Sequence, residues 1–234
     1  MPNDGVLWEM QPHTEAKHAI LKNYLNAWLP IMTSWNGRVV FLDGFAGPGR
    51  YTGGELGSPL IALEAALKHR QPIKSQVLFL FIEADLRRFQ HLQGILDSVY
   101  QPRLAGTPFS YQAINGKFDN AMGRVLGELE ESSLLLAPTF AFIDPFGYSD
   151  TPFTMIQRLM KQPRCEVLIN FNYEELNRFL LLESQWPHFD QQFGTGQWRT
   201  GVALAGESRQ QYLHDLYKTQ LENGAGSGTS VLFR

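Results

Sequence analysis

The chain has 234 residues, of which 44% are hydrophobic and 18% are charged. This length and apolar content are those of one ordinary globular domain with a large core. The formal net charge of −3 argues against a generally basic, nucleic-acid-binding surface, although a local groove on an acidic protein can still be basic. The single cysteine, Cys165, excludes an internal disulfide framework and a cysteine metal site, and we expect it to be a small core residue.

Targeting and metal-binding patterns are missing from the sequence. No apolar run approaches the roughly 18 residues of a membrane span, and residues 1–11 lack the basic-then-apolar pattern of a secretion signal. The six histidines show no i, i+4 pairing and no acid at metal-ligand spacing. The sequence therefore predicts a cytoplasmic protein that has no contact with a membrane and holds no metal.

The first predicted element is a helix over Glu15–Ser34, which carries Lys17 and His18 near its start. Its apolar residues recur at helical spacing, which is mostly a signal of packing. These residues are Ile20, Leu21, Tyr24, Leu25 and Trp28.

The next predicted element is a strand, Arg38–Asp43, that runs directly into a glycine-rich loop. Four apolar residues before an acid are typical of a central parallel strand with both faces covered. Gly44, Gly47 and Gly49 follow where the chain must turn and let its backbone approach a ligand. The loop lacks the Gly-Lys-Ser/Thr ending of a triphosphate loop and does not have the G-x-G-x-x-G spacing of nicotinamide binding. An ordinary glycine turn is the alternative interpretation.

An acid at a strand end followed by G-x-x-G-x-G resembles the first motif of class I S-adenosylmethionine (SAM) methyltransferases. In that family the loop lies against the methionine part of the cofactor. The resemblance implies that Asp43 orders the site and that Gly44, Gly47 and Gly49 contact SAM.

A second acid-terminated strand strengthens this interpretation. Ser58 is expected to cap, and Pro59 to open, a helix that reaches Lys68. The apolar run that begins at Gln76 then predicts a strand, Val77–Glu83. In a doubly wound sheet this acid lies beside the glycine loop, so we predict that Glu83 accepts hydrogen bonds from ribose hydroxyls. A solvated strand-end acid is the alternative.

The remaining elements continue the alternation of strands and helices, which predicts an α/β, Rossmann-like doubly wound sheet. Residues 223–230 are expected to form a flexible turn, after which residues 231–234 begin another strand, so we expect the C-terminal strands of the sheet to be missing. We predict one domain over residues 1–234, with an N-terminal helix (14–34), a cofactor-binding core (38–171) and a helical segment with the start of a strand (172–234). The other expected strands are Phe109–Ile114, Thr139–Asp144 and Glu166–Phe171, and the other helices are Leu86–Val99, Phe118–Glu131, Thr151–Lys161 and Glu174–Leu182.

The stretch Asp144-Pro145-Phe146-Gly147-Tyr148 follows the fourth strand. It resembles the Asp-Pro-Pro-Tyr/Phe motif of enzymes that methylate an exocyclic amine of a base. The resemblance implies that Asp144 and the Pro145 carbonyl accept the amine's hydrogens, and that Phe146 or Tyr148 stacks on the base. The sequence departs from the motif, because Phe146 replaces the second proline and Gly147 stands at the aromatic position. A simple Asp-Pro turn is the alternative.

Several motifs in combination resemble the three-Cys-motif partner protein (TcmP) family. That family implies a methyltransferase-like fold and a partner protein with three cysteines, but no established reaction. A more distant resemblance to the bacterial enzyme that methylates an adenine N6 of large-subunit ribosomal RNA favours adenine in RNA or DNA as the substrate. The motifs are Lys17–Leu21, Tyr24–Trp28, Asp43–Tyr51, Gly57–Pro59, Phe142–Gly147, Asn170-Phe171 and Asn177-Arg178.

Other candidate residues are suggested by related methyltransferases or by their expected place near the strand ends, and several have an alternative interpretation. His18, with Lys17, is expected to contact SAM or substrate, or else to lie at a surface or interface. Asn115 and Asp119 are expected to contact the adenine amine of the cofactor, or to be ordinary polar loop residues. The remaining substrate-binding candidates are Arg50, Tyr51, Tyr148 and Arg178, and the aromatic residues Trp186, Phe189, Phe193 and Trp198 form either a substrate-facing insert or a satellite core.

The sequence thus favours a SAM-dependent methyltransferase that acts on an amino nitrogen with a three-Cys-motif partner. The alternative is a catalytically silent scaffold that keeps the fold and binds that partner. A third hypothesis is a sensor or toxin-defence component that binds the cofactor without transferring methyl.

Overall fold

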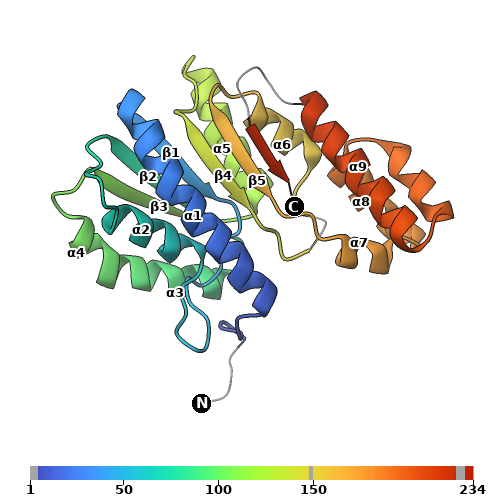
Figure 1. Cartoon of the computed structure of the whole chain (residues 1–234), viewed down its shortest axis with the longest axis horizontal. Coiled ribbons are helices and arrows are strands. Elements are labelled where there is room, and N and C mark those ends of the chain that lie inside the picture. The colour runs from blue at the N-terminus through green and yellow to red at the C-terminus, as the bar shows by residue number, and fades with distance from the viewer. Residues whose placement is uncertain (1–4, 148–149, 225–229, 234) are drawn as a thin grey trace. The chain divides into compact units, whose positions relative to one another are not determined.

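The computed structural model describes residues 5–147, 150–224 and 230–233. The chain is α/β with parallel strand pairings, consistent with a Rossmann-like fold (Figure 1). It divides into two compact units, Met1–Lys117 with Ala137–Thr139, and Phe118–Leu136 with Phe140–Arg234. Each unit has its own strands, helices and core.

The sheet of the first unit has the order β3-β2-β1, formed by β1 (Arg38–Asp43), β2 (Gln76–Glu83) and β3 (Phe109–Asn115). All of these strands are parallel, with Asp43 in register with Phe81 and Glu83 in register with Asn115. Every residue of β1 after Arg38 is buried, as its continuous apolar run predicts. Parallel pairing brings the carboxyl ends of these strands to one edge, where the glycine loop begins.

The helices of the first unit are α1 (Pro12–Trp35), α2 (Ser58–Leu67), α3 (Leu86–Ile95) and the short α4 (Gln101–Leu104). Helix α1 packs beside α2 (Figure 1) and buries Leu21, Leu25, Trp28 and Leu29. Asp85 begins α3, because its carboxylate accepts hydrogen bonds from the backbone N–H groups of Arg87 and Arg88.

The second unit contains α5 (Phe118–Glu131), β4 (Thr139–Ile143, of which Thr139 belongs to the first unit), α6 (Phe153–Met160) and β5 (Cys165–Ile169). A further strand, β6 (Ser230–Phe233), pairs with β5 in parallel, so the strand order of this unit is β4-β5-β6. Cys165 is fully buried, and burial with the neighbouring Glu166 raises the pKa of its thiol to about 12. The prediction that Cys165 is a core residue is confirmed.

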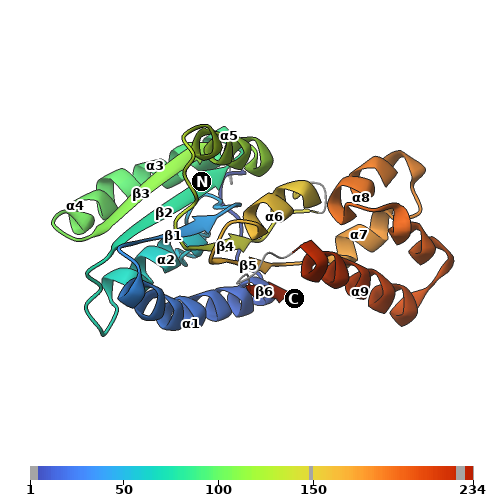
Figure 2. The same cartoon turned by 90° about the horizontal axis from the view of Figure 1, so that it is seen from above.

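Three helices complete the second unit, namely α7 (Tyr173–Phe179), α8 (Trp186–Phe193) and α9 (Gly206–Gly224). Helix α8 packs against α6 and α9 (Figure 2). The rings of Phe171 and Tyr217 stack with their centroids 5.0 Å apart, and Phe153 and Phe193 each meet Tyr217 edge-on. An aromatic core therefore joins these helices to the end of β5.

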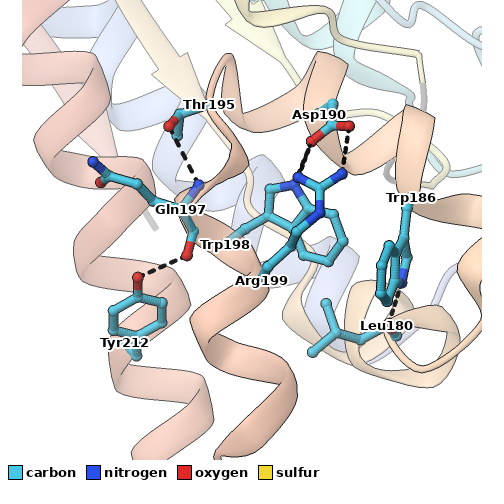
Figure 3. Close-up of polar contacts among 8 residues, drawn as sticks. All are labelled: Leu180, Trp186, Asp190, Thr195, Gln197, Trp198, Arg199 and Tyr212. Carbon is cyan, nitrogen blue, oxygen red and sulfur yellow. Dashed lines mark hydrogen bonds and ion pairs between the residues drawn. The ribbon is translucent and has the colours of Figure 1, made fainter.

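A second aromatic cluster lies around Asp190 (Figure 3). The Asp190 carboxylate accepts bonds from both Arg199 guanidinium nitrogens, at 2.6 and 2.8 Å, and from Trp198 Nε1 at 2.9 Å. The Arg199 guanidinium also lies over the Trp198 ring, 4.6 Å from its centroid. Phe189, Phe193 and Trp198 are fully buried, so these three form a satellite core and not a substrate-facing surface, whereas Trp186 is half-buried.

Several predicted boundaries are wrong. Ser58 does not cap its helix, since Gly57 is the capping residue and Ser58 is the first helical residue. The helix predicted over Leu86–Val99 ends at Ile95 and continues as a π-helical turn, Leu96–Tyr100. Helix α6 begins after Pro152 and not at Thr151, and β4 ends before Asp144.

Within the part of the chain that the structure describes, no helix combines the length and the apolarity needed to cross a membrane. The flexible turn expected over residues 223–230 falls mainly on 225–229, which lie outside the described residues.

Candidate functional site

The loop after β1 has positive φ angles at two of its glycines. Gly47 has a φ of +63° and Gly49 a φ of +83°, values that residues with a Cβ rarely adopt. Asp43 is fully buried, and its Oδ1 accepts a hydrogen bond of 3.1 Å from the Phe45 backbone N–H. The strand-end acid therefore holds the first turn of the loop.

Glu83, at the end of the neighbouring strand, holds the middle of the same loop. Its Oε2 accepts a hydrogen bond of 2.8 Å from the Gly47 N–H, and its Oε1 accepts one of 2.8 Å from the Asp85 N–H. Only 6% of Glu83 is exposed, so the alternative of a solvated strand-end acid is wrong. Glu83 links the glycine loop to the start of α3.

The protonation of Glu83 reflects a competition between burial and these bonds. Burial raises the pKa of the Glu83 carboxyl, whereas the bonds from Asp85 and Gly47 and the positive charge of Arg88 lower it, and burial dominates. A carboxylate has about four acceptor positions, of which these two bonds use two. The chemistry of the group thus leaves acceptor capacity for ligand hydroxyls beside its role in the loop.

Asn115 stabilises the same edge of the sheet. Its side-chain Nδ2 donates to the backbone carbonyl oxygens of Glu83, at 2.9 Å, and Ala84, at 3.2 Å. The Gly116 N–H also donates to the Glu83 carbonyl. The other residue predicted to contact the cofactor's adenine, Asp119, lies in the first turn of α5, in the second unit.

Trp8 is a neighbour of the glycine loop that the sequence did not reveal. Its Cη2 lies 3.7 Å from the position that a Cβ would take on Gly47, and its carbonyl accepts a 3.1 Å bond from the Thr52 N–H. Its ring meets Tyr51 edge-on with centroids 5.9 Å apart, and the Arg88 guanidinium lies 4.7 Å from its centroid. Trp8 precedes α1 in a segment without periodicity, so only the folded chain brings it to the loop.

The substrate-binding candidates of the first unit gather around the end of the loop. His18 is 8% exposed, and its ring centroid lies 5.7 Å from that of Tyr51, so the expectation of a surface histidine is wrong. Arg50 Nη1 donates to the Gly54 carbonyl at 2.9 Å, which ties the guanidinium to the turn that follows the loop. Lys17 lies one residue before His18 on α1 and is partly exposed.

The candidate catalytic residues lie in the second unit, where they follow β4. Asp144 is partly exposed, and its Oδ1 accepts a 2.9 Å hydrogen bond from Asn170 Nδ2. Pro145 is buried, whereas Phe146 is 59% exposed. Tyr148 lies outside the described residues.

Two further observations concern this unit. Arg178 forms an ion pair of 3.0 Å with Glu175 and is a surface residue of α7. Asn170 orients Asp144 through its amide, and its backbone N–H donates to the Ile143 carbonyl at 3.0 Å. The sequence placed Asn170 in a family motif, but gave it no role.

Across residues 5–147, 150–224 and 230–233, no three His, Cys, Asp or Glu side chains gather in a way that would hold a metal ion. No protein-family model matches the chain, and a search of curated proteins gives no match to it. The family resemblance therefore rests on the sequence motifs and stays a prediction.

Proposed function

We propose that the chain is a SAM-dependent methyltransferase that acts on an amino nitrogen. The observation that supports this most is the glycine loop, in which Gly47 and Gly49 have left-handed backbone angles and Glu83 accepts the Gly47 N–H. The loop stands at the carboxyl ends of adjacent parallel strands, which is where open α/β sheets bind their ligands. SAM itself would supply a methyl group on a positively charged sulfur.

The residues of the first unit fit such a cofactor. A loop of buried glycines brings backbone N–H groups close to a ligand without a Cβ between them. Glu83 retains acceptor capacity for the two ribose hydroxyls beside its bonds to Gly47 and Asp85. Trp8 and Tyr51 add aromatic surface next to the loop.

The proposed role of the second unit is to orient the amine. Asp144 and the Pro145 carbonyl accept its two hydrogens, which leaves the nitrogen lone pair available to accept a methyl group. Asn170 fixes the Asp144 carboxylate for this task. An adenine amine in nucleic acid as substrate, and a three-Cys-motif protein as partner, are proposed from the sequence resemblance alone.

A catalytically silent scaffold is the second candidate, and one observation favours it. Both Glu83 oxygens already accept backbone N–H groups, and the loop residues Gly44 and 46–49 are buried. A loop with a purely structural role would be anchored and buried in the same way. The scaffold would use exposed groups such as Phe146 to bind its partner.

Calorimetric titration of SAM and S-adenosylhomocysteine into the protein separates these candidates. We expect binding that Gly47→Val abolishes, because a β-branched residue cannot adopt a φ of +63° without strain. Asp144→Ala should bind SAM within a few fold of wild type but lose methyl transfer to RNA or DNA. Glu131→Ala, which changes an exposed acid at the end of α5, is the control. A folded protein that binds neither compound would exclude the methyltransferase and leave the scaffold.

A further inference from the structure

A groove in the first unit lies away from the glycine loop. It has a volume of about 700 Å³ and runs along α1 and α2. None of the residues assigned above to the cofactor or the substrate lines it. Its lining comes from α1, from α2 and from the residues on either side of α2.

The one acid in this lining is already neutralised. Glu64 accepts bonds from both terminal nitrogens of Arg103, from the Lys68 ammonium at 2.9 Å and from the Tyr100 hydroxyl at 2.9 Å. The hydrogen bond from Arg103 is the main reason why the pKa of Glu64 is lowered to about 2. Glu64 is thus an ionised but compensated group, and it does not cancel the charge of other cations in the groove.

Two cations of the groove remain available. Among the residues that the structure describes, neither Lys22 on α1 nor Arg70 after α2 has a carboxylate within ion-pair distance. Both side chains belong to exposed residues. The groove therefore carries two uncompensated positive charges, one on α1 and one in the segment that follows α2.

His69, which also lines the groove, connects the two segments that carry these cations. His69 Nε2 lies 3.0 Å from the Asn26 carbonyl oxygen and donates to it, because a carbonyl oxygen can only accept, while His69 Nδ1 lies beside the Gln71 N–H and carbonyl, at 3.1 and 3.0 Å. His69 thereby ties the segment that carries Arg70 to α1. Two carbonyls at the end of α2, those of Glu64 and Ala66, are already paired, because they accept the Lys68 and His69 N–H groups.

The lining of the groove is partly apolar. Pro30, Leu56, Ile61 and Ala65 contribute apolar surface beside the amides and cations. A cavity of this size with apolar surface and a few polar groups suits a small molecule that has a planar or apolar body. Arginine and lysine together suit a phosphate, which takes bidentate and point-charge contacts.

We propose that this groove binds a nucleotide-sized phosphate ester, with the phosphate held by Lys22 and Arg70 and the base or similar ring against the apolar lining residues. The ligand is either a free nucleotide or one residue of a single strand, since both present the same chemistry. The proposal does not depend on SAM binding, because the groove shares no residue with the glycine loop.

The test is a titration with UMP, whose pyrimidine avoids competition from a pocket for the adenine of SAM. We expect wild-type binding that weakens with salt, uridine that binds at least tenfold more weakly, and a double variant K22E/R70E that loses at least tenfold in affinity. The neutral variant K22Q/R70Q should lose less. The charge-matched control K74E/K161E, which alters two exposed lysines outside the groove, should bind as wild type does.

A labelled single-stranded oligouridylate, titrated in parallel, identifies the source of the ligand. Tighter binding of the oligonucleotide than of UMP, lost in K22E/R70E, assigns the groove to a strand, and equal or weaker binding assigns it to a free nucleotide. Binding of neither UMP nor oligouridylate to the folded protein overturns the proposal, as does binding that K22E/R70E leaves unchanged. A SAM titration of the same wild-type protein is evaluated separately, so a failure of the methyltransferase proposal is distinguished from a failure of this one.

Discussion

Replacing Glu83 by alanine should loosen the glycine loop. The change removes the acceptor of two backbone N–H groups, those of Gly47 and Asp85, each of which lies 2.8 Å from a carboxylate oxygen. An orphaned N–H costs about 1–3 kcal/mol, with the upper part of that range for the buried Gly47 and the lower part for the partly exposed Asp85. Removing the carboxylate also relieves a burial penalty, which the raised pKa of Glu83 reveals. We expect a net loss of about 2 kcal/mol in the free energy of unfolding.

The Glu83→Gln variant separates hydrogen bonding from charge. Its amide oxygen still accepts one N–H, and it carries no charge to bury, so its stability at neutral pH should lie within about 1 kcal/mol of wild type. The pKa of Glu83 is raised above 4.5 in the folded state, so folding favours the protonated form. The stabilisation that Glu83 contributes in the wild-type protein is therefore present below pH 4.5 and is lost as the pH rises through the pKa that Glu83 has in the folded state. Glu83→Gln should lack this pH dependence.

Urea denaturation followed by circular dichroism gives the global stability, and hydrogen exchange of single amides gives the local effect. The Gly47 amide should lose protection in Glu83→Ala, whereas the neighbouring Ala46 amide, which donates to the Ile82 carbonyl, serves as the internal reference. Glu131→Ala is the matched control for loss of an acid. Unchanged Gly47 protection, with stability within about 0.5 kcal/mol of wild type, would refute the anchoring role of the carboxylate.

Three further predictions concern other parts of the chain. Glu64→Gln should lower the free energy of unfolding by about 1–2 kcal/mol at pH 7. The lowered pKa of Glu64 taken alone implies a larger loss, but its partners Arg103 and Lys68 are 38% and 74% exposed, so solvent screens these ion pairs. Wild-type stability from Glu64 should disappear as the pH falls from 4.5 to about 2, and a urea midpoint with the same pH profile in Glu64→Gln would contradict this. Asp190→Ala removes the acceptor of the buried Trp198 Nε1–H and should lower the free energy of unfolding by about 1–3 kcal/mol, with a change in tryptophan emission. An unaltered melting temperature and emission spectrum would show that packing alone holds the indole. Gly49→Ala should lower the melting temperature more than Gly54→Ala. Both glycines have a positive φ, but only at Gly49 would a Cβ lie 2.9 Å from a side-chain carbon of Leu92. Equal decreases in melting temperature would mean that backbone strain accounts for the whole effect.

The local sequence predicted an element correctly where buried residues recur along it in a regular pattern. The strand Arg38–Asp43 and the helix Phe118–Glu131 have the predicted bounds, because a continuous apolar run and a helical repeat each indicate directly which residues are buried. The loop glycines were also recognisable, since only glycine adopts such angles cheaply. The position of Glu83 followed from its place at a strand end.

Contacts between distant segments were not recognisable. Trp8 meets the glycine loop, and the groove gathers residues from Lys22 to Gln71, without any local motif. Helices α8 and α9 were missed as separate elements because their aromatic residues are spaced among glutamines and glycines, and the burial of Trp198 depends on Asp190 and Arg199. Side-chain pairing of this kind is a property of the folded chain.

The two bonds that Glu83 makes change how a loss of SAM binding must be interpreted. A carboxylate that accepts the Gly47 N–H orders the loop, so Glu83→Ala would weaken SAM binding even if no ribose hydroxyl ever touched it. Glu83→Gln, with one oxygen acceptor left, resolves the ambiguity when its Gly47 amide remains protected from exchange. If SAM affinity then falls, the carboxylate contacts the ribose directly, because the loop is still ordered. If affinity is retained, the contribution of Glu83 is to the shape of the loop, because its bond to the Gly47 N–H is then the interaction that matters, and the ribose is recognised by other groups.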